Sequence, residues 1–66
     1  MTIPEISKKY NISEAYLNSK DDALTIAAAS LIDLKGMLDG NYPKKALADK
    51  MQFLADFLRD VKNSTY

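Results

Sequence analysis

Apolar residues recur at helical spacing along most of this 66-residue chain. Between positions 20 and 38 they form a heptad pattern, with alternating intervals of three and four residues, at Leu24, Ala27, Leu31, Leu34 and Leu38. Between positions 43 and 63 a second heptad pattern is formed by Leu47, Met51, Leu54, Leu58 and Val61. Both stretches are therefore predicted to be α-helices that pack through these faces.

Capping and turn residues separate the predicted helices. Thr2, followed by proline and by Glu5, matches a capping box and predicts a first helix over about 3–11, followed by a short turn at 13–18. Ser19 and the two aspartates after Lys20 predict the start of a second helix, about 20–38. The segment from Asp39 to Pro43 is a short break, and a third helix is expected over about 43–63. A loop of this length predicts an antiparallel hairpin.

The segment Ala23–Ile32 is apolar at every position except Thr25 and Ser30. A helix that is apolar on all sides is usually surrounded by other structure, yet a domain of about 60 residues buries only about 60% of its unfolded surface. The chain has no cysteine and no histidine, so disulfides and common zinc sites cannot supply the missing stability. Self-association is the remaining way to stabilise so small a domain.

We therefore predict an all-α fold: one domain over 1–66, dominated by the hairpin and forming a helical-bundle dimer or a complex with another protein. The alternative is an ordinary three-helix core in which the first segment covers the apolar patch. The residues expected at a protein interface are Leu24, Ala28, Leu31, Ile32, Phe53 and Phe57. Truncation to alanine is expected to cost about 2–5 kcal/mol where the side chain is fully buried. The residues for which we expect this are Leu24, Leu31, Leu54, Phe57 and Leu58.

Composition argues against several classes of function. Nine Lys plus Arg balance nine Asp plus Glu, so net charge gives no reason to expect a polyanionic partner. Without histidine or cysteine we expect no catalytic residues, no metal, no cofactor and no small-molecule substrate. The ten-residue apolar run is about half the length that a membrane-spanning helix needs. The N-terminus lacks an apolar stretch typical of a signal peptide, so a cytoplasmic protein is expected.

One local pattern indicates a different function. In residues 3–20, Ile6, Tyr10, Ile12 and Leu17 supply apolar positions, Ser7 a small residue and Asn11 a turn, and this stretch resembles a helix-turn-helix motif. The resemblance covers about a quarter of the chain, and Lys20 stands where the motif has an apolar residue. It implies a DNA-binding regulator whose hairpin dimerises. The residues that would contact DNA are then Lys8, Lys9, Ser13, Asn18 and Lys20.

In outline, a hairpin closed by Asp39–Pro43 is similar to the hairpin co-chaperones of bacterial secretion systems and to bacteriocin immunity bundles, but no diagnostic motif carries over. We favour a non-enzymatic interaction module: a small regulator, inhibitor or chaperone-like adaptor that acts through an apolar helical face. Its partner is a second copy or another protein. The DNA-binding regulator is the alternative.

Overall fold

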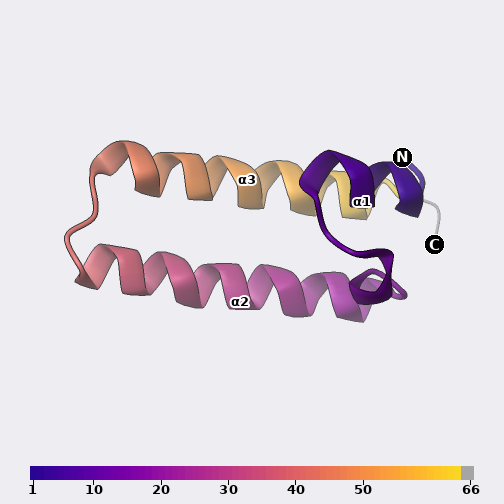
Figure 1. Ribbon diagram of the computed structural model, residues 1–66, viewed down its shortest axis with the longest axis horizontal. Coiled ribbons are helices and arrows are strands. Elements are labelled where there is room, and N and C mark those ends of the chain that lie inside the picture. Colours follow the sequence, from indigo (N-terminus) through magenta and orange to yellow (C-terminus); the bar gives the residue numbers. More distant parts are fainter. Residues whose placement is uncertain (65–66) are drawn as a thin grey trace.

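The computed structural model describes residues 1–64; residues 65 and 66 of the expected domain lie outside the described residues. Its elements are α1 (Ile3–Tyr10), the 3-10 turn η1 (Glu14–Tyr16), α2 (Lys20–Asp39) and α3 (Lys44–Lys62). The helices α2 and α3 form an antiparallel hairpin, and α1 lies beside the C-terminal half of α3 (Figure 1). The molecule is 37 Å long and 17 Å across. An all-α fold with three helices is thus confirmed for the part of the chain that the structure describes.

Short-range hydrogen bonds explain where the helices begin and end. The Thr2 hydroxyl accepts from the Glu5 backbone N–H, and the Glu5 carboxylate accepts from the Thr2 backbone N–H, so the capping box is formed. Asn11 ends α1 in the left-handed conformation, with φ 55° and ψ 46°. The Ser19 hydroxyl accepts from the Asp22 N–H at the start of α2. The hairpin turn uses a left-handed residue as well, Asn41, with φ 57°.

The core lies at the end of the hairpin away from its loop, where α1, η1 and the two long helices meet. Phe57, Ile6 and Leu17 are its largest fully buried side chains, and Ala23 and Val61 complete it. Around this core the partly buried apolar residues are Ile3, Tyr10, Ile12, Ile26 and Phe53. The first nineteen residues therefore cover one end of the hairpin and leave most of its length uncovered.

The face of α2 that packs on α3 differs from the expected one. We expected Leu24, Leu31 and Leu38 in the hairpin seam, but these three leucines are exposed. The buried positions are Ala23, Ala27 and Ser30, with Leu34 and Met37 partly buried. These positions also alternate at intervals of four and three; Ala27 and Leu34 belong to the expected pattern too, while Ala23, Ser30 and Met37 each precede an expected leucine by one residue. Since nearly every position in 23–32 is apolar, the sequence pattern fits either face.

Side-chain size explains the choice of seam. α3 buries the large side chains Leu54 and Phe57, whereas the buried residues of α2, Ala23, Ala27 and Ser30, are small. Small side chains let two helices approach closely and let large ones fill the space between them at native density. Leu54 and Phe57 are buried as expected, whereas Leu24, Leu31 and Leu58 are exposed in the single chain.

Candidate interaction surface

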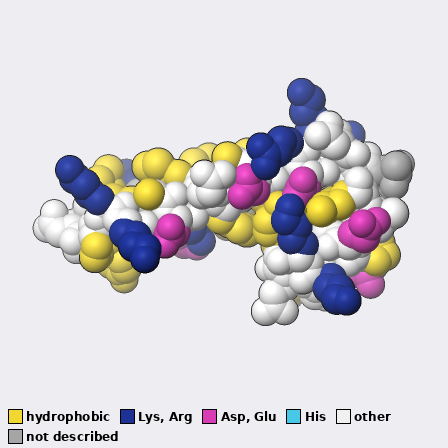
Figure 2. Space-filling model, turned by 90° about the horizontal axis from the view of Figure 1, so that it is seen from above, with side chains coloured by type: hydrophobic (Ala, Val, Ile, Leu, Met, Phe, Trp, Pro, Cys, Tyr) yellow, Lys and Arg dark blue, Asp and Glu magenta, His cyan; other side chains and the backbone are white. Residues whose placement is uncertain are grey.

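Five of the large apolar side chains exposed on the hairpin lie on one side of it, and we call them the open face: Leu24, Leu31 and Leu38 of α2 with Met51 and Leu58 of α3. Their exposed fractions run from 38% at Leu58 to 63% at Leu38. Figure 2 shows hydrophobic side chains along the length of the hairpin that α1 leaves uncovered. The open face thus draws its apolar side chains from both helices of the hairpin.

Helical geometry places these side chains on the side opposite α1 and η1. Two residues along an α-helix turn by about 200°, so they point in nearly opposite directions. On α3, Met51 and Leu58 precede Phe53 and Asp60 by two residues, and the latter pair contacts α1. On α2, Leu24 likewise precedes Ile26, which lies beside η1. The open face thus has no intramolecular cover from the described N-terminal segment.

Charged residues border the open face in two separate rows. The same 100° step per residue places Lys44 and Lys62 next to the apolar strip on α3, and Asp21 and Asp39 next to it on α2. Asp39 also forms an ion pair with Lys35, whose Nζ lies 2.8 Å from Asp39 Oδ2. The α2 side of the open face therefore carries Asp21 and Asp39 together with Lys20 and Lys35, while the outer border of α3 is basic.

The predicted interface residues divide between exposed and covered positions. Leu24, Ala28, Leu31 and Ile32 are exposed, and Ile32, at 72%, points away from α3. The remaining two, Phe53 and Phe57, lie under α1, and Phe57 is fully buried.

Tyr10 of α1 is the side chain that covers the two phenylalanines. Its ring meets Phe53 and Phe57 edge to face, with centroid distances of 5.7 and 5.4 Å. Phe57 is thus part of the monomer core and has no surface for a partner. Sequence reasoning missed Leu38, Met51 and Leu58 as surface residues because it assigned them to the hairpin seam.

A polar cluster holds α1 against α3. Lys9 Nζ lies 2.8 Å from Asp60 Oδ2, and the Tyr10 hydroxyl donates to the same oxygen. The hydrogen bonds from Lys9 and then Tyr10 lower the pKa of Asp60, while the bond to Asp60 raises the pKa of Lys9. Burial, followed by the bond to Asp60, raises the pKa of Tyr10. The three groups satisfy one another, so this cluster is a fastening between two helices.

The residues named for DNA contact do not form a reading helix. The segment after the Asn11 turn contains only η1, three residues long, where a helix-turn-helix needs a second α-helix. Ser13 caps η1 by accepting from the Ala15 N–H, and the Asn18 side chain donates to the Ala15 carbonyl. Lys9 is paired with Asp60, while Lys8 and Lys20 are exposed at separate places, on α1 and at the start of α2.

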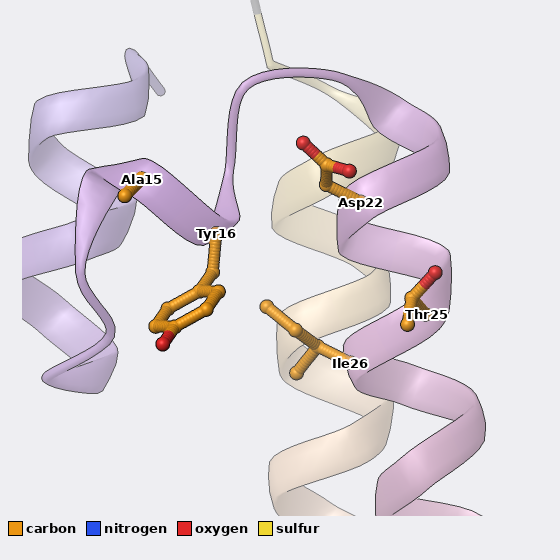
Figure 3. A pocket seen from close by; sticks show the side chains of 5 residues that line it. All are labelled: Ala15, Tyr16, Asp22, Thr25 and Ile26. Atoms are coloured by element: carbon orange, nitrogen blue, oxygen red, sulfur yellow. The ribbon is translucent and has the colours of Figure 1, made fainter.

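A shallow hollow of about 120 Å³ lies between η1 and α2, lined by Ala15, Tyr16, Asp22, Thr25 and Ile26 (Figure 3). Ligand pockets have volumes of about 300–1,000 Å³, so this hollow holds at most a small side chain. Within residues 1–64, no three acidic side chains cluster as metal ligands would. No helix among the same residues has the length and hydropathy to cross a bilayer.

Comparisons of the chain with protein-family models, with curated proteins and with solved structures find no match. The surface chemistry of the molecule is consequently the basis on which a function is assigned.

Proposed function

We propose that this chain is a non-enzymatic protein–protein interaction module, a small regulator, inhibitor or adaptor, that binds a helical protein partner through the open face. The observation that carries the proposal is the exposure of Leu24, Leu31, Leu38, Met51 and Leu58 on one side of the hairpin. Contiguous exposed apolar patches on small proteins mark binding surfaces. Full burial of a leucine or methionine side chain contributes about 1.5–3 kcal/mol, so even partial burial of five of them drives association.

The shape of the open face favours a helical partner. Its side chains come from two antiparallel helices, so the apolar stripe of another helix or helix pair can pack along them. The middle of the open face is apolar and charged residues lie along its borders and toward its ends, the usual order of a binding surface with an apolar centre and a polar rim.

The other functional classes draw less support from the same geometry. At about 2 Å rise per residue, η1 is about 6 Å long and offers no surface for a DNA groove, so we do not carry the DNA-binding alternative forward. The titratable side chains Lys9, Tyr10 and Asp60 are engaged in fastening α1. We place the module in the cytoplasm as part of the proposal, since a chain without cysteine loses no disulfide under reducing conditions.

The test compares two lysine substitutions on opposite sides of α2. Leu31→Lys puts a charge in the middle of the open face, whereas Ala29→Lys, two residues earlier, puts the same charge on the opposite side of the helix. Both positions are exposed, so both variants should keep the helical circular dichroism spectrum. The wild-type chain and each variant are immobilised in turn. Each is exposed to purified chain of the same sequence and, separately, to lysate of the native cells.

The proposal expects that binding of any protein, a second copy included, falls at least about tenfold in Leu31→Lys and is unchanged in Ala29→Lys. A photo-crosslinking residue at position 31 should label the bound protein, and the same residue at position 29 should not. Equal binding by the two lysine variants would show that the open face is not the binding surface. Absence of any protein bound to the wild-type chain would refute the proposal as a whole.

A further inference from the structure

We infer that the open face binds a second copy of this chain, and that the two copies are related by a two-fold axis parallel to the long axis of the hairpin. This inference rests on the proposed function, because it names the partner of the same surface. It follows from the register of the hairpin, the symmetry of a dimer and the distribution of charge along the borders of the open face.

The register of the hairpin fixes which residues of α2 and α3 lie at the same height. Lys50 Nζ of α3 lies 4.0 Å from Asp33 Oδ2 of α2, so these two residues are at about the same height. The last residue of α2, Asp39, and the first residue of α3, Lys44, give the same register at the loop end. Because the helices are antiparallel, each step toward the C-terminus on α2 corresponds to one step toward the N-terminus on α3, with about 1.5 Å of rise. Asp21 therefore lies level with Lys62, and Asp39 level with Lys44.

A two-fold rotation about an axis parallel to the helices leaves every residue at its own height. When the open faces of two copies meet in this way, α2 of each copy lies against α3 of the other, and these neighbours are antiparallel. All four helices then alternate in direction, as in an up-down-up-down bundle. The register within one copy is thus also the register between copies.

Residues of complementary character meet across both contacts of this dimer. Asp21 of one copy lies level with Lys62 of the second copy, and Asp39 with Lys44 of the second copy, so a carboxylate meets an ammonium group at each end, beside Lys20 and Lys35 of α2. Between them Ala28 lies level with Ala55 of the second copy, and both alanines are exposed in the single chain. Small residues in facing positions allow two helices to approach closely.

The apolar centre matches in the same register. Leu31 lies within one residue of the height of Met51 of the second copy, and Leu24 within one residue of Leu58 of the second copy. Lys35, the charged residue within the α2 strip, lies level with Ala48 of the second copy, whose small side chain leaves room for the lysine stem.

The competing symmetric arrangement has its axis perpendicular to the helices and in the plane of the open face. It stacks α3 on α3 and α2 on α2. The basic borders with Lys44 and Lys62 would then face each other. Like charges across an interface oppose association, so the charge pattern selects the parallel axis.

The open face is also large enough for a dimer. A helix of 20 residues is about 30 Å long, and the molecule is 17 Å across. The face of each copy thus projects about 500 Å², and two copies bury about 1,000 Å² in total, the lower limit for a specific interface. A small, reversible dimer is the expected product.

Cysteine cross-linking tests the arrangement directly, because the natural chain contains no cysteine. Ala28→Cys and Ala55→Cys chains are prepared separately, unfolded, mixed in equal amounts, refolded together and mildly oxidised. With the parallel axis, we expect a disulfide-linked pair in the mixture and none in either variant alone. The reason is that Ala28 of one copy lies diagonally across the bundle from Ala28 of the second copy. A disulfide between two Ala28→Cys chains, with none between an Ala28→Cys and an Ala55→Cys chain in the mixture, would overturn the parallel axis.

Exchange of charges gives a second test. Asp21→Lys and Lys62→Asp each place like charges at two symmetry-related contacts, so each should weaken self-association by about tenfold. A mixture of the two variants restores opposite charges at both contacts and should dimerise as the wild-type chain does. A mixture no stronger than the separate variants would contradict the pairing of Asp21 with Lys62.

Sedimentation equilibrium separates this inference from the proposed function. A dimer in the wild-type chain and in Ala29→Lys, with a monomer in Leu31→Lys, is the expected result. A wild-type chain that stays monomeric at the highest soluble concentration refutes the second copy as partner. The proposed function is then judged separately, by whether the monomer binds another protein in a way that Leu31→Lys abolishes.

Discussion

The clearest difference between the sequence pattern and the folded molecule can be tested with one substitution at two leucines. Leu17 and Leu24 are both large apolar residues near the start of α2, and the heptad pattern assigned the severe loss to Leu24. In the structure Leu17 is fully buried and Leu24 is 55% exposed. We therefore expect Leu17→Ala to be severely destabilising and Leu24→Ala to be mild.

The expected magnitudes follow from burial. Truncating a fully buried leucine to alanine removes its transfer free energy and leaves a cavity, which together cost about 2–5 kcal/mol. Leu24 has less than half of its side chain to lose from the interior, so its truncation should cost under about 1 kcal/mol in the monomer. A single core in a chain of this size rarely supplies more than about 3–5 kcal/mol. Leu17→Ala should therefore leave a large fraction of the chain unfolded at room temperature.

The assay is urea unfolding followed by far-ultraviolet circular dichroism, at a concentration where sedimentation shows a monomer. The midpoint should fall sharply in Leu17→Ala and by a small amount in Leu24→Ala, with similar slopes for the two transitions. Equal losses at the two positions would show that Leu24 lies in the monomer core and that the open face is wrongly placed. At higher concentration Leu24→Ala should instead weaken self-association.

Three further predictions concern stability away from the open face. Gly36→Ala should raise the free energy of unfolding by about 1 kcal/mol, because Gly36 lies in a helix interior and an added Cβ would have no packed neighbour within 4 Å. Gly40→Ala is the control: its Cβ would lie 3.3 Å from the Gly36 carbonyl oxygen, so the same urea titration should show no such gain. The hydrogen bond from Lys9 lowers the pKa of Asp60, so its contribution to stability is complete above the ordinary value of 3.8 and is lost as the pH falls through the lowered pKa. Thermal melts should show a weaker acid dependence in Asp60→Asn than in the wild type, and an unchanged dependence would exclude this fastening. Asn11→Gly should keep or increase stability and Asn11→Ala should lose about 1–2 kcal/mol, because φ at this position is 55°; equal stabilities in urea would contradict the strain.

Local sequence determined the helices of this protein. Thr2 with Glu5, Ser19 with Asp22 and the Asn11 turn act through hydrogen bonds between residues at most five positions apart, and these bonds are present in the folded chain. Helix starts and stops depend on such short-range contacts. The three helices and the antiparallel hairpin were therefore predictable from the order of the residues.

Only the tertiary structure decided which face of α2 is buried. Ala23 and Leu24 are adjacent apolar residues, and hydrophobic periodicity alone accepts either as part of the seam. The choice depends on how side chains of α2 fit those of α3, which is a property of residues more than twenty positions apart. The buried face carries the small residues Ala23, Ala27 and Ser30, which let α3 approach closely, whereas the other face carries Leu24 and Leu31.

The position of α1 on the hairpin also depends on the tertiary structure. Tyr10 covers Phe53 and Phe57, which turns a predicted interface into a core and leaves the opposite side of the hairpin open. The charged pair Lys9 and Asp60 carried a signal for this docking, but nothing local relates residues 51 positions apart. Short-range hydrogen bonds determine whether a segment is helical, whereas which face of a helix is buried depends on packing over the whole chain. In a helix that is apolar on every side, the neighbouring helices decide which face that is.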